Sequence, residues 1–432
     1  MYKILSSLTI TWCLLHFCEP YKLLIVFPIP GKSHSILGNA FVNHLLNSGH
    51  QVSYITPIPM TPRPGLRQIN VESNFNYFVS DEELNIQKLM TKEIDMKDMT
   101  TLFTLMFKIS NATVLHENVQ MLLHDNSEKF DAVIAEWMYS ELYSGFSAVF
   151  NCPLIWFLSV SPHSMALSLI DDISNPAFTA DHVRSNSIPP FTFLERVNEL
   201  ATLIRWKFNR WWVKSRDCKS YNQAFESAIL KRNLVYLPLD EAKYNGSLMF
   251  VNSHVSTSDA ITIPRNVIEI GGYHINNTVE PLPEDLRMIM DQSKHGVILF
   301  SMGSMLKSTK LPDKIKKEII KFINVNRAVA KGFAKRVDLN DNTPVNLKIA
   351  IDEIISSPKY RERIGELSFI YHDRALSPEA EIVRWIHHVV RTGGATHLRS
   401  PAILMHCKRP QMRRPCGTRD ILDPIYEFRS RW

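Results

Sequence analysis

The chain has 432 residues, of which 45% are hydrophobic and 21% are charged. This is ordinary globular composition, and it excludes a disordered chain, a collagen-like chain and a small disulfide-held scaffold. The formal net charge is +6, but the seven basic and three acidic residues between Cys407 and Trp432 supply +4 of it. The rest of the chain is nearly neutral, so nucleic acid is not an expected partner.

Residues 1–20 are typical of a signal peptide. Lys3 precedes an uncharged and mostly apolar run from Ile4 to Cys18, which is short for a membrane span. A buried N-terminal strand or helix is the alternative interpretation. Three acceptor sequons agree with entry into the secretory pathway. They predict N-linked glycans on Asn111, Asn245 and Asn276.

Residues 21–280 alternate between apolar runs and helical patterns. Strands are predicted at 21–28, 51–56, 130–135, 153–159, 248–253 and 267–270. Helices are predicted at 35–48, at about 111–124 and in a segment that runs through Ala148. This βαβ rhythm predicts an α/β domain with a doubly wound sheet, and it places ligands at the carboxyl ends of the strands.

Residues 281–402 repeat the pattern less completely. The segment 279–294, which contains Pro281 and Pro283, is predicted to be a linker into a second domain. The elements expected there are a buried strand at 296–300, a helix that begins near Pro312, and helices at 344–356, 358–371 and 378–391. One strand and four helices cannot cover both faces of a sheet. We therefore predict that part of this domain is absent, which would leave the apolar faces of 296–300 and 378–391 exposed.

Two residues are candidates for proton transfer. His34 lies at the start of the helix after the first strand, and Glu136 directly follows the strand at 130–135. In the common doubly wound order these two strands are neighbours, so both side chains can meet at one sheet edge. The helix N-terminus is expected to keep the imidazole neutral, and a carboxylate behind the ring would orient it. A helix-capping histidine and an unrelated loop glutamate remain the alternative.

Several motifs in series carry a resemblance. They lie at residues 28–36, 45–52, 251–254, 264–275, 281–286, 296–304, 326–334, 358–361 and 391–400. In this order they resemble the animal UDP-glycosyltransferases, especially those of insects. The resemblance implies a GT-B-like fold of two Rossmann-like domains. Residues 21–280 would bind the acceptor, and residues 281–402 would bind the UDP-sugar.

The resemblance also implies roles for individual residues. His34 matches the catalytic base, and Glu136 occupies its partner position, where the family usually has Asp. Gly303 and Ser304 match the turn that contacts the nucleotide diphosphate, where backbone N–H groups face phosphates. The co-substrate would be a UDP-sugar, and no metal would be needed. The implied acceptor is a small lipophilic molecule with a hydroxyl group, and the implied location is the lumen of the endoplasmic reticulum.

The sequence departs from the family at two places. Between Asn324 and Val325 the segment that grips uracil, phosphate and sugar is missing. After Ala402 the family's membrane helix is replaced by an atypical basic tail, 403–432, so the membrane anchor is absent. Two functions are therefore considered. One is an inverting hexosyltransferase, and the other is an inactive relative that binds lipophilic small molecules in the lumen.

Residues 203–216 combine four aromatic side chains with five basic ones. A basic, aromatic and amphipathic helix can lie on a membrane surface, so peripheral membrane contact is one interpretation. The other is a helix that packs its aromatic side chains on the acceptor domain.

Overall fold

The computed structural model describes residues 20–77, 99–171, 175–179, 190–258, 261–275, 281–294, 297, 299, 325–337, 343–401 and 403. Several predictions fall outside these residues. They concern the signal peptide, Asn276, Gly303, Ser304, the helix that begins near Pro312 and nearly all of the tail after 402. Most of the strand expected at 296–300 is also outside them.

Seven parallel strands form one sheet in the order β3-β2-β1-β4-β5-β6-β7, which confirms the α/β class. The strands are β1 Lys22–Val26, β2 Gln51–Thr56, β3 Leu66–Asn70, β4 Ala132–Glu136, β5 Leu154–Leu158, β6 Gly246–Val251 and β7 Val267–Glu269. The six strands predicted within residues 21–280 all occur, while β3 was not expected from the sequence. β1 lies between β2 and β4, so the expected neighbours at the centre of the sheet are confirmed.

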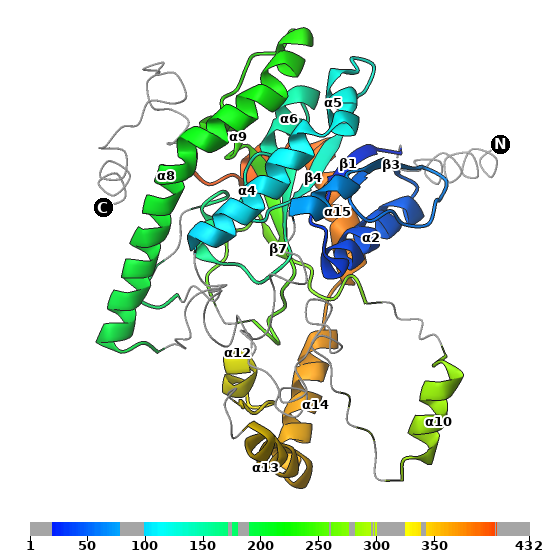
Figure 1. Cartoon of the computed structure of the whole chain (residues 1–432), viewed down its shortest axis with the longest axis vertical. Coiled ribbons are helices and arrows are strands. Elements are labelled where there is room, and N and C mark those ends of the chain that lie inside the picture. The colour runs from blue at the N-terminus through cyan, green and yellow to red at the C-terminus, as the bar shows by residue number, and fades with distance from the viewer. Residues whose placement is uncertain are drawn as a thin grey trace, which may run out of the picture.

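Helices occupy most of the remaining described chain (Figure 1). The helices before residue 260 are α2 Lys32–Asn47, α4 Met99–Leu115, α5 Glu117–His124, α6 Ser144–Phe150, α7 Ser164–Leu167, α8 Phe193–Lys231 and α9 Leu239–Ala242, with a 3-10 turn η1 Glu72–Tyr77. Those after it are α10 Glu284–Gln292, α12 Val325–Ala330, α13 Thr343–Ser356, α14 Pro358–His372 and α15 Pro378–Arg391, with a 3-10 turn η3 Thr396–Leu398. The predictions at 344–356, 358–371 and 378–391 are confirmed by α13, α14 and α15.

Two helix boundaries differ from the prediction. α2 begins at Lys32, because the extended residue Gly31 caps it through its carbonyl, which accepts the N–H of Ser35 at 3.0 Å. The helix expected at 111–124 is two helices, α4 and α5. His116 separates them, since its extended backbone ends the first helix and its side chain accepts the N–H of Asn118.

The sheet is covered on both faces. Strands buried on both faces need near-continuous apolar runs, and β4 and β5 are buried at every position. Helices α4, α5, α6 and α8 contribute to the apolar cluster on one face, and α2 contributes to the cluster on the other. This arrangement leaves the carboxyl ends of the strands as one edge where loops meet.

Helix α15 completes the second face, which corrects an expectation. Ile382, Ile386 and Val389 are fully buried and belong to the same apolar cluster as Phe41 and Leu45 of α2. The prediction that this helix exposes its apolar face is therefore wrong. α15, which the sequence analysis assigned to the second domain, packs in the core of the first.

The other described helices after residue 280 are less covered. α10 buries none of its residues, and Figure 1 shows it standing apart from the remaining helices. α13 and α14 contact each other, yet Ile355 and Phe369 expose 71% and 73% of their surface. No helix among the described residues is long and apolar enough to cross a membrane.

Candidate functional site

His34 and Glu136 meet at the carboxyl edge of the central strands. β1 leads into the first turn of α2, which carries His34, and β4 ends at Glu136. Val26 and Ala135 are paired in register, so the two segments leave the sheet side by side. Nδ1 of His34 lies 2.5 Å from Oε1 of Glu136. The extra methylene of glutamate is thus compatible with contact between these two side chains.

The electrostatics of the pair follow from its burial. Glu136 is fully buried, whereas the side chain of His34 is 20% exposed. Burial by itself lowers the pKa of His34. The negative charge of Glu136 and the hydrogen bond to it act in the opposite direction and prevail, so this pKa is raised from its ordinary value. The expected influence of the helix N-terminus, which would favour a neutral ring, is overcome by the carboxylate.

The tautomer follows from the same contact. A carboxylate accepts hydrogen bonds, so Nδ1 of neutral His34 carries the proton and donates it. Nε2 then holds a lone pair, and it makes no hydrogen bond to the part of the chain that the structure describes. The ring can therefore accept a proton at Nε2 while Glu136 stabilises the resulting charge.

Gly38 is a contributor that the sequence analysis missed. It lies one turn after His34 in α2, and a Cβ at this position would come 2.2 Å from the hydroxyl oxygen of Tyr54 on β2. The missing side chain lets α2 approach the sheet closely. Tyr273 strengthens the approach, since its hydroxyl donates to the carbonyl of Leu37 at 3.0 Å. A glycine inside a helix destabilises it by about 1 kcal/mol relative to alanine. The presence of Gly38 within a predicted helix was therefore the sequence feature that could have indicated close packing at this position.

The carboxyl edge continues past β7. Arg374, which follows α14, donates from Nη2 to the carbonyl oxygen of Gly271 at 2.8 Å and stacks over the ring of Tyr371. Gly272 has a positive φ of 93°, and a Cβ there would lie 1.5 Å from the hydroxyl of Tyr371. The end of α14 is thereby fastened to the same edge of the sheet as the pair. The diphosphate contacts expected from Gly303 and Ser304 lie outside the described residues.

Two of the predicted glycan acceptors can be placed. Asn111 is half-buried in α4, and its Oδ1 accepts a hydrogen bond of 2.5 Å from the hydroxyl of Ser220 on α8. Asn245 is half-buried just before β6, and Ser247 of its sequon is fully buried. Glycosylation of all three asparagines stays a prediction.

A family model described as UDP-glucoronosyl and UDP-glucosyl transferase matches residues 23–323 and 321–406. The match therefore covers most of the chain, but in two blocks that meet at residues 321–323. This junction lies beside the point between Asn324 and Val325 where the sequence analysis finds a segment missing.

Curated relatives share about a quarter of their residues with this chain. A UDP-glucosyltransferase 2 of Dactylopius coccus is 24% identical over 461 residues, covering 89% of this chain and 87% of the relative. A UDP-glucuronosyltransferase 2B1 of Rattus norvegicus is 23% identical over 461 residues, covering 85% and 84%. Both alignments exceed the 432 residues of this chain, so each relative contains residues without a counterpart here.

Solved glycosyltransferase structures also align with the chain. The glycotransferase of kitacinnamycin gives a TM-score of 0.47 with 11% identity, covering 86% of this chain and 98% of the other. The calicheamicin glycosyltransferase CalG4 gives 0.45 with 13% identity, covering 87% and 99%.

Proposed function

The chain belongs to the UDP-glucuronosyl and UDP-glucosyl transferase family, and we propose that it transfers a hexosyl group from a UDP-sugar to the hydroxyl of a small lipophilic acceptor. His34 would be the general base, and Glu136 would be its partner. The observation that carries this proposal is the 2.5 Å contact between Nδ1 of His34 and Oε1 of Glu136, which leaves Nε2 able to accept a proton.

The proposed reaction is a single displacement with inversion. Nε2 of His34 takes the proton of the acceptor hydroxyl as the oxygen forms a bond to the anomeric carbon of the sugar. The bond between that carbon and the diphosphate oxygen breaks on the opposite side, and UDP leaves with the electron pair. General-base assistance of this kind contributes about 10²–10⁴ in rate. The imidazolium that forms is stabilised by the buried carboxylate of Glu136.

Base catalysis requires the neutral form of His34. Because Glu136 raises the pKa of His34, the active form becomes populated only as the pH rises through that raised value. The acid limb of the pH–rate profile should therefore lie above the ordinary histidine pKa of about 6.5.

The part of the proposed site that would bind the UDP-sugar has less support than the part that contains His34 and Glu136. We propose that the diphosphate is stabilised by backbone N–H groups near Gly303 and Ser304 and by helix N-termini, without a metal. The two-block family match favours a second candidate function, that of an inactive relative which binds lipophilic molecules. Under either function we propose residence in the lumen of the endoplasmic reticulum.

We further propose peripheral membrane contact through α8. Ile204, Phe208 and Trp212 recur every fourth residue on this helix, and they expose 47%, 51% and 55% of their surface. Trp206 instead packs against the core. Within residues 203–216, Trp206 thus fits the interpretation of packing on the acceptor domain, whereas Phe208 and Trp212 fit the interpretation of membrane contact. Apolar and aromatic side chains on one face of a basic helix suit the lipid–water interface.

Co-sedimentation with liposomes of mixed neutral and anionic lipids tests the membrane proposal. The double variant Phe208→Ala/Trp212→Ala should lose most of the bound fraction. Met121→Ala removes an exposed apolar side chain from α5, where 65% of the methionine surface is accessible, and should leave binding unchanged. Equal binding by the wild type and the double variant would exclude this surface.

Substitution of the base tests the transferase proposal. With UDP-glucose at a high millimolar concentration, to offset the weak donor binding expected of this chain, and with a phenolic acceptor, His34→Ala should lower the rate of transfer by about 10²–10⁴ relative to the wild type. Glu136→Asp keeps the carboxylate in the form that the family usually carries and is expected to retain turnover. Full activity of a folded His34→Ala protein would show that another group is the base. A wild type that binds the acceptor but never forms product would favour the second candidate function.

A further inference from the structure

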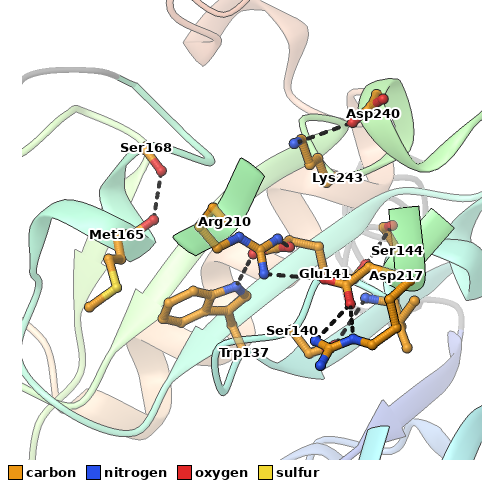
Figure 2. Close-up of polar contacts among 12 residues, drawn as sticks. Trp137, Ser140, Glu141, Ser144, Met165, Ser168, Arg210, Asp217, Asp240 and Lys243 are labelled. Atoms are coloured by element: carbon orange, nitrogen blue, oxygen red, sulfur yellow. Dashed lines mark hydrogen bonds and ion pairs between the residues drawn. The ribbon is translucent and has the colours of Figure 1, made fainter. Parts of the chain in front are cut away.

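A cluster of buried charges lies between α8 and the loop that follows β4 (Figure 2). Glu141 and Asp217 are buried, and the side chain of Arg210 between them is 19% exposed. Nη2 of Arg210 donates to Oε2 of Glu141, and Nη1 lies 3.4 Å from Oδ2 of Asp217. Arg216 adds a second guanidinium to Asp217, with Nη2 at 3.0 Å from Oδ1. None of these groups takes part in the proposed proton transfer.

Stability alone is a poor explanation for this cluster. Burial lowers the pKa of Arg210 against the opposing charge of Asp217, so removal from water is costly at this side chain. Well-packed apolar residues often hold two elements together as well as a buried ion pair does. What a hydrogen-bonded charge pair adds is one defined arrangement of the groups that it joins.

Glu141 connects the cluster to the strand end that carries Glu136. Oε1 of Glu141 accepts the indole N–H of Trp137 at 3.2 Å. Trp137 directly follows Glu136 and is buried, and its backbone N–H donates to the carbonyl of Phe157 at 2.8 Å. The residue next to the carboxylate is therefore held from two sides. Its backbone is held by β5, and its side chain is held by Glu141, which in turn is paired with Arg210 of α8.

The loop between Trp137 and Glu141 needs such support. Tyr139 has a φ of 56°, which lies in the left-handed region that non-glycine residues rarely adopt. A conformation of this kind persists only where the surroundings determine it. The ring of Tyr139 packs 5.2 Å from that of Trp137 and 6.1 Å from that of His163. A shift of Trp137 would disturb this packing together with the end of β4.

We propose that Arg210 is a positioning residue that acts through Glu141 and Trp137 to hold the carboxylate of Glu136 at hydrogen-bond distance from His34. This inference rests on the proposed pairing of His34 with Glu136, and it gives α8 a part in setting the geometry of the base. The guanidinium of Arg210 contacts Glu141 and Asp217, so its proposed effect on His34 is indirect and acts on the distance between His34 and Glu136.

The test is an NMR titration of the His34 imidazole in the full chain, with the resonance assigned through His34→Gln. In Arg210→Met the carboxylate should move away from the ring, and the pKa of His34 should fall by about one unit. Loss of a distant positive charge by itself would raise this pKa, so the direction of the shift separates positioning from long-range electrostatics. Trp137→Phe removes the indole N–H without changing any charge, and it should also lower the pKa.

Two controls make the result decisive. Arg216→Met removes a neighbouring guanidinium that contacts Asp217 but not Glu141, and it should not lower the pKa of His34. Glu136→Gln must lower this pKa, and its failure to do so would overturn the pairing itself. A normal response to Glu136→Gln with an unchanged or raised pKa in folded Arg210→Met would overturn the positioning role alone. Should Arg210→Met fail to fold, an unchanged pKa in Trp137→Phe would overturn it.

Discussion

The two halves of the chain bury their apolar side chains to different extents. Around the seven-stranded sheet, both faces are covered, and the central strands β4 and β5 are buried throughout. In α13 and α14, by contrast, Ile355 and Phe369 expose most of their surface, and α10 buries nothing. Helices with an apolar stripe become stable by packing on a second layer. The first half has that layer, whereas the described helices of the second half largely lack one.

Helix α15 is the exception that sharpens this comparison. It belongs to the second half by position in the chain, yet its apolar side chains are as buried as those of the central strands. The contrast is therefore between elements that reach the sheet and elements that do not, and sequence position is secondary. The proposed base pair lies in the covered part.

The largest effect is expected at the buried face of α15. Ile386→Ala should lower the free energy of unfolding by about 2–5 kcal/mol, because the side chain is fully buried and leaves a cavity. The matched variant Ile355→Ala on α13 removes a side chain that is 71% exposed, and it should change the free energy by no more than about 0.5 kcal/mol. Urea unfolding followed by circular dichroism measures both, and equal losses would refute the comparison.

The second expected effect concerns the donor. The segment that the resemblance assigns to uracil and the sugar is expected to be missing between Asn324 and Val325, and its loss should weaken UDP-sugar binding by several kcal/mol, since base stacking on an aromatic side chain alone contributes about 1–3 kcal/mol. A micromolar affinity would then move to the millimolar range or beyond. Calorimetric titration of UDP-glucose into the chain should show negligible heat. Saturable binding at micromolar concentrations would mean that the second half forms a donor site without that segment.

A smaller effect is expected from the charge of His34. A histidine whose pKa is raised on folding contributes stability that is fully present below the unfolded value of about 6.5 and is lost as the pH rises through the folded value. The stability of the wild type relative to Glu136→Gln should therefore increase on acidification from pH 8 to pH 5.5. Each unit of raised pKa contributes about 1.4 kcal/mol.

Thermal unfolding over this pH range checks the prediction. Glu72→Gln, which removes an exposed carboxylate from the turn after β3, serves as the matched control and should show no such dependence on pH. A difference between the wild type and Glu136→Gln that stays flat or shrinks on acidification would mean that His34 and Glu136 are not paired in solution.

Much of the covered half was predictable from the sequence. The apolar runs at β1, β4 and β5 have the continuous pattern of strands buried on both faces, and parallel order brings their ends to one edge. The meeting of His34 with Glu136 follows from that topology. What the pattern does not give is distance, because the 2.5 Å contact also depends on the close approach of α2 at Gly38.

Long-range packing was not predictable in the same way. The periodicity of α15 shows which face is apolar, but not which surface covers it, and Phe41 and Leu45 lie far away in the chain. Arg210 illustrates the same limit. Its pattern is that of a basic amphipathic helix, and only the fold reveals that its guanidinium meets Glu141, which lies 69 positions earlier.

Hydrogen exchange across the whole chain tests the contrast between the two halves most directly. Amides of covered elements open only with larger unfolding events, whereas those of sparsely packed helices open locally. At neutral pH the slowest amides should lie in β1, β4, β5 and α15, while α10, α13 and α14 should exchange orders of magnitude faster. Protection of α13 and α14 equal to that of β4 would contradict this account, as would rapid exchange in α15.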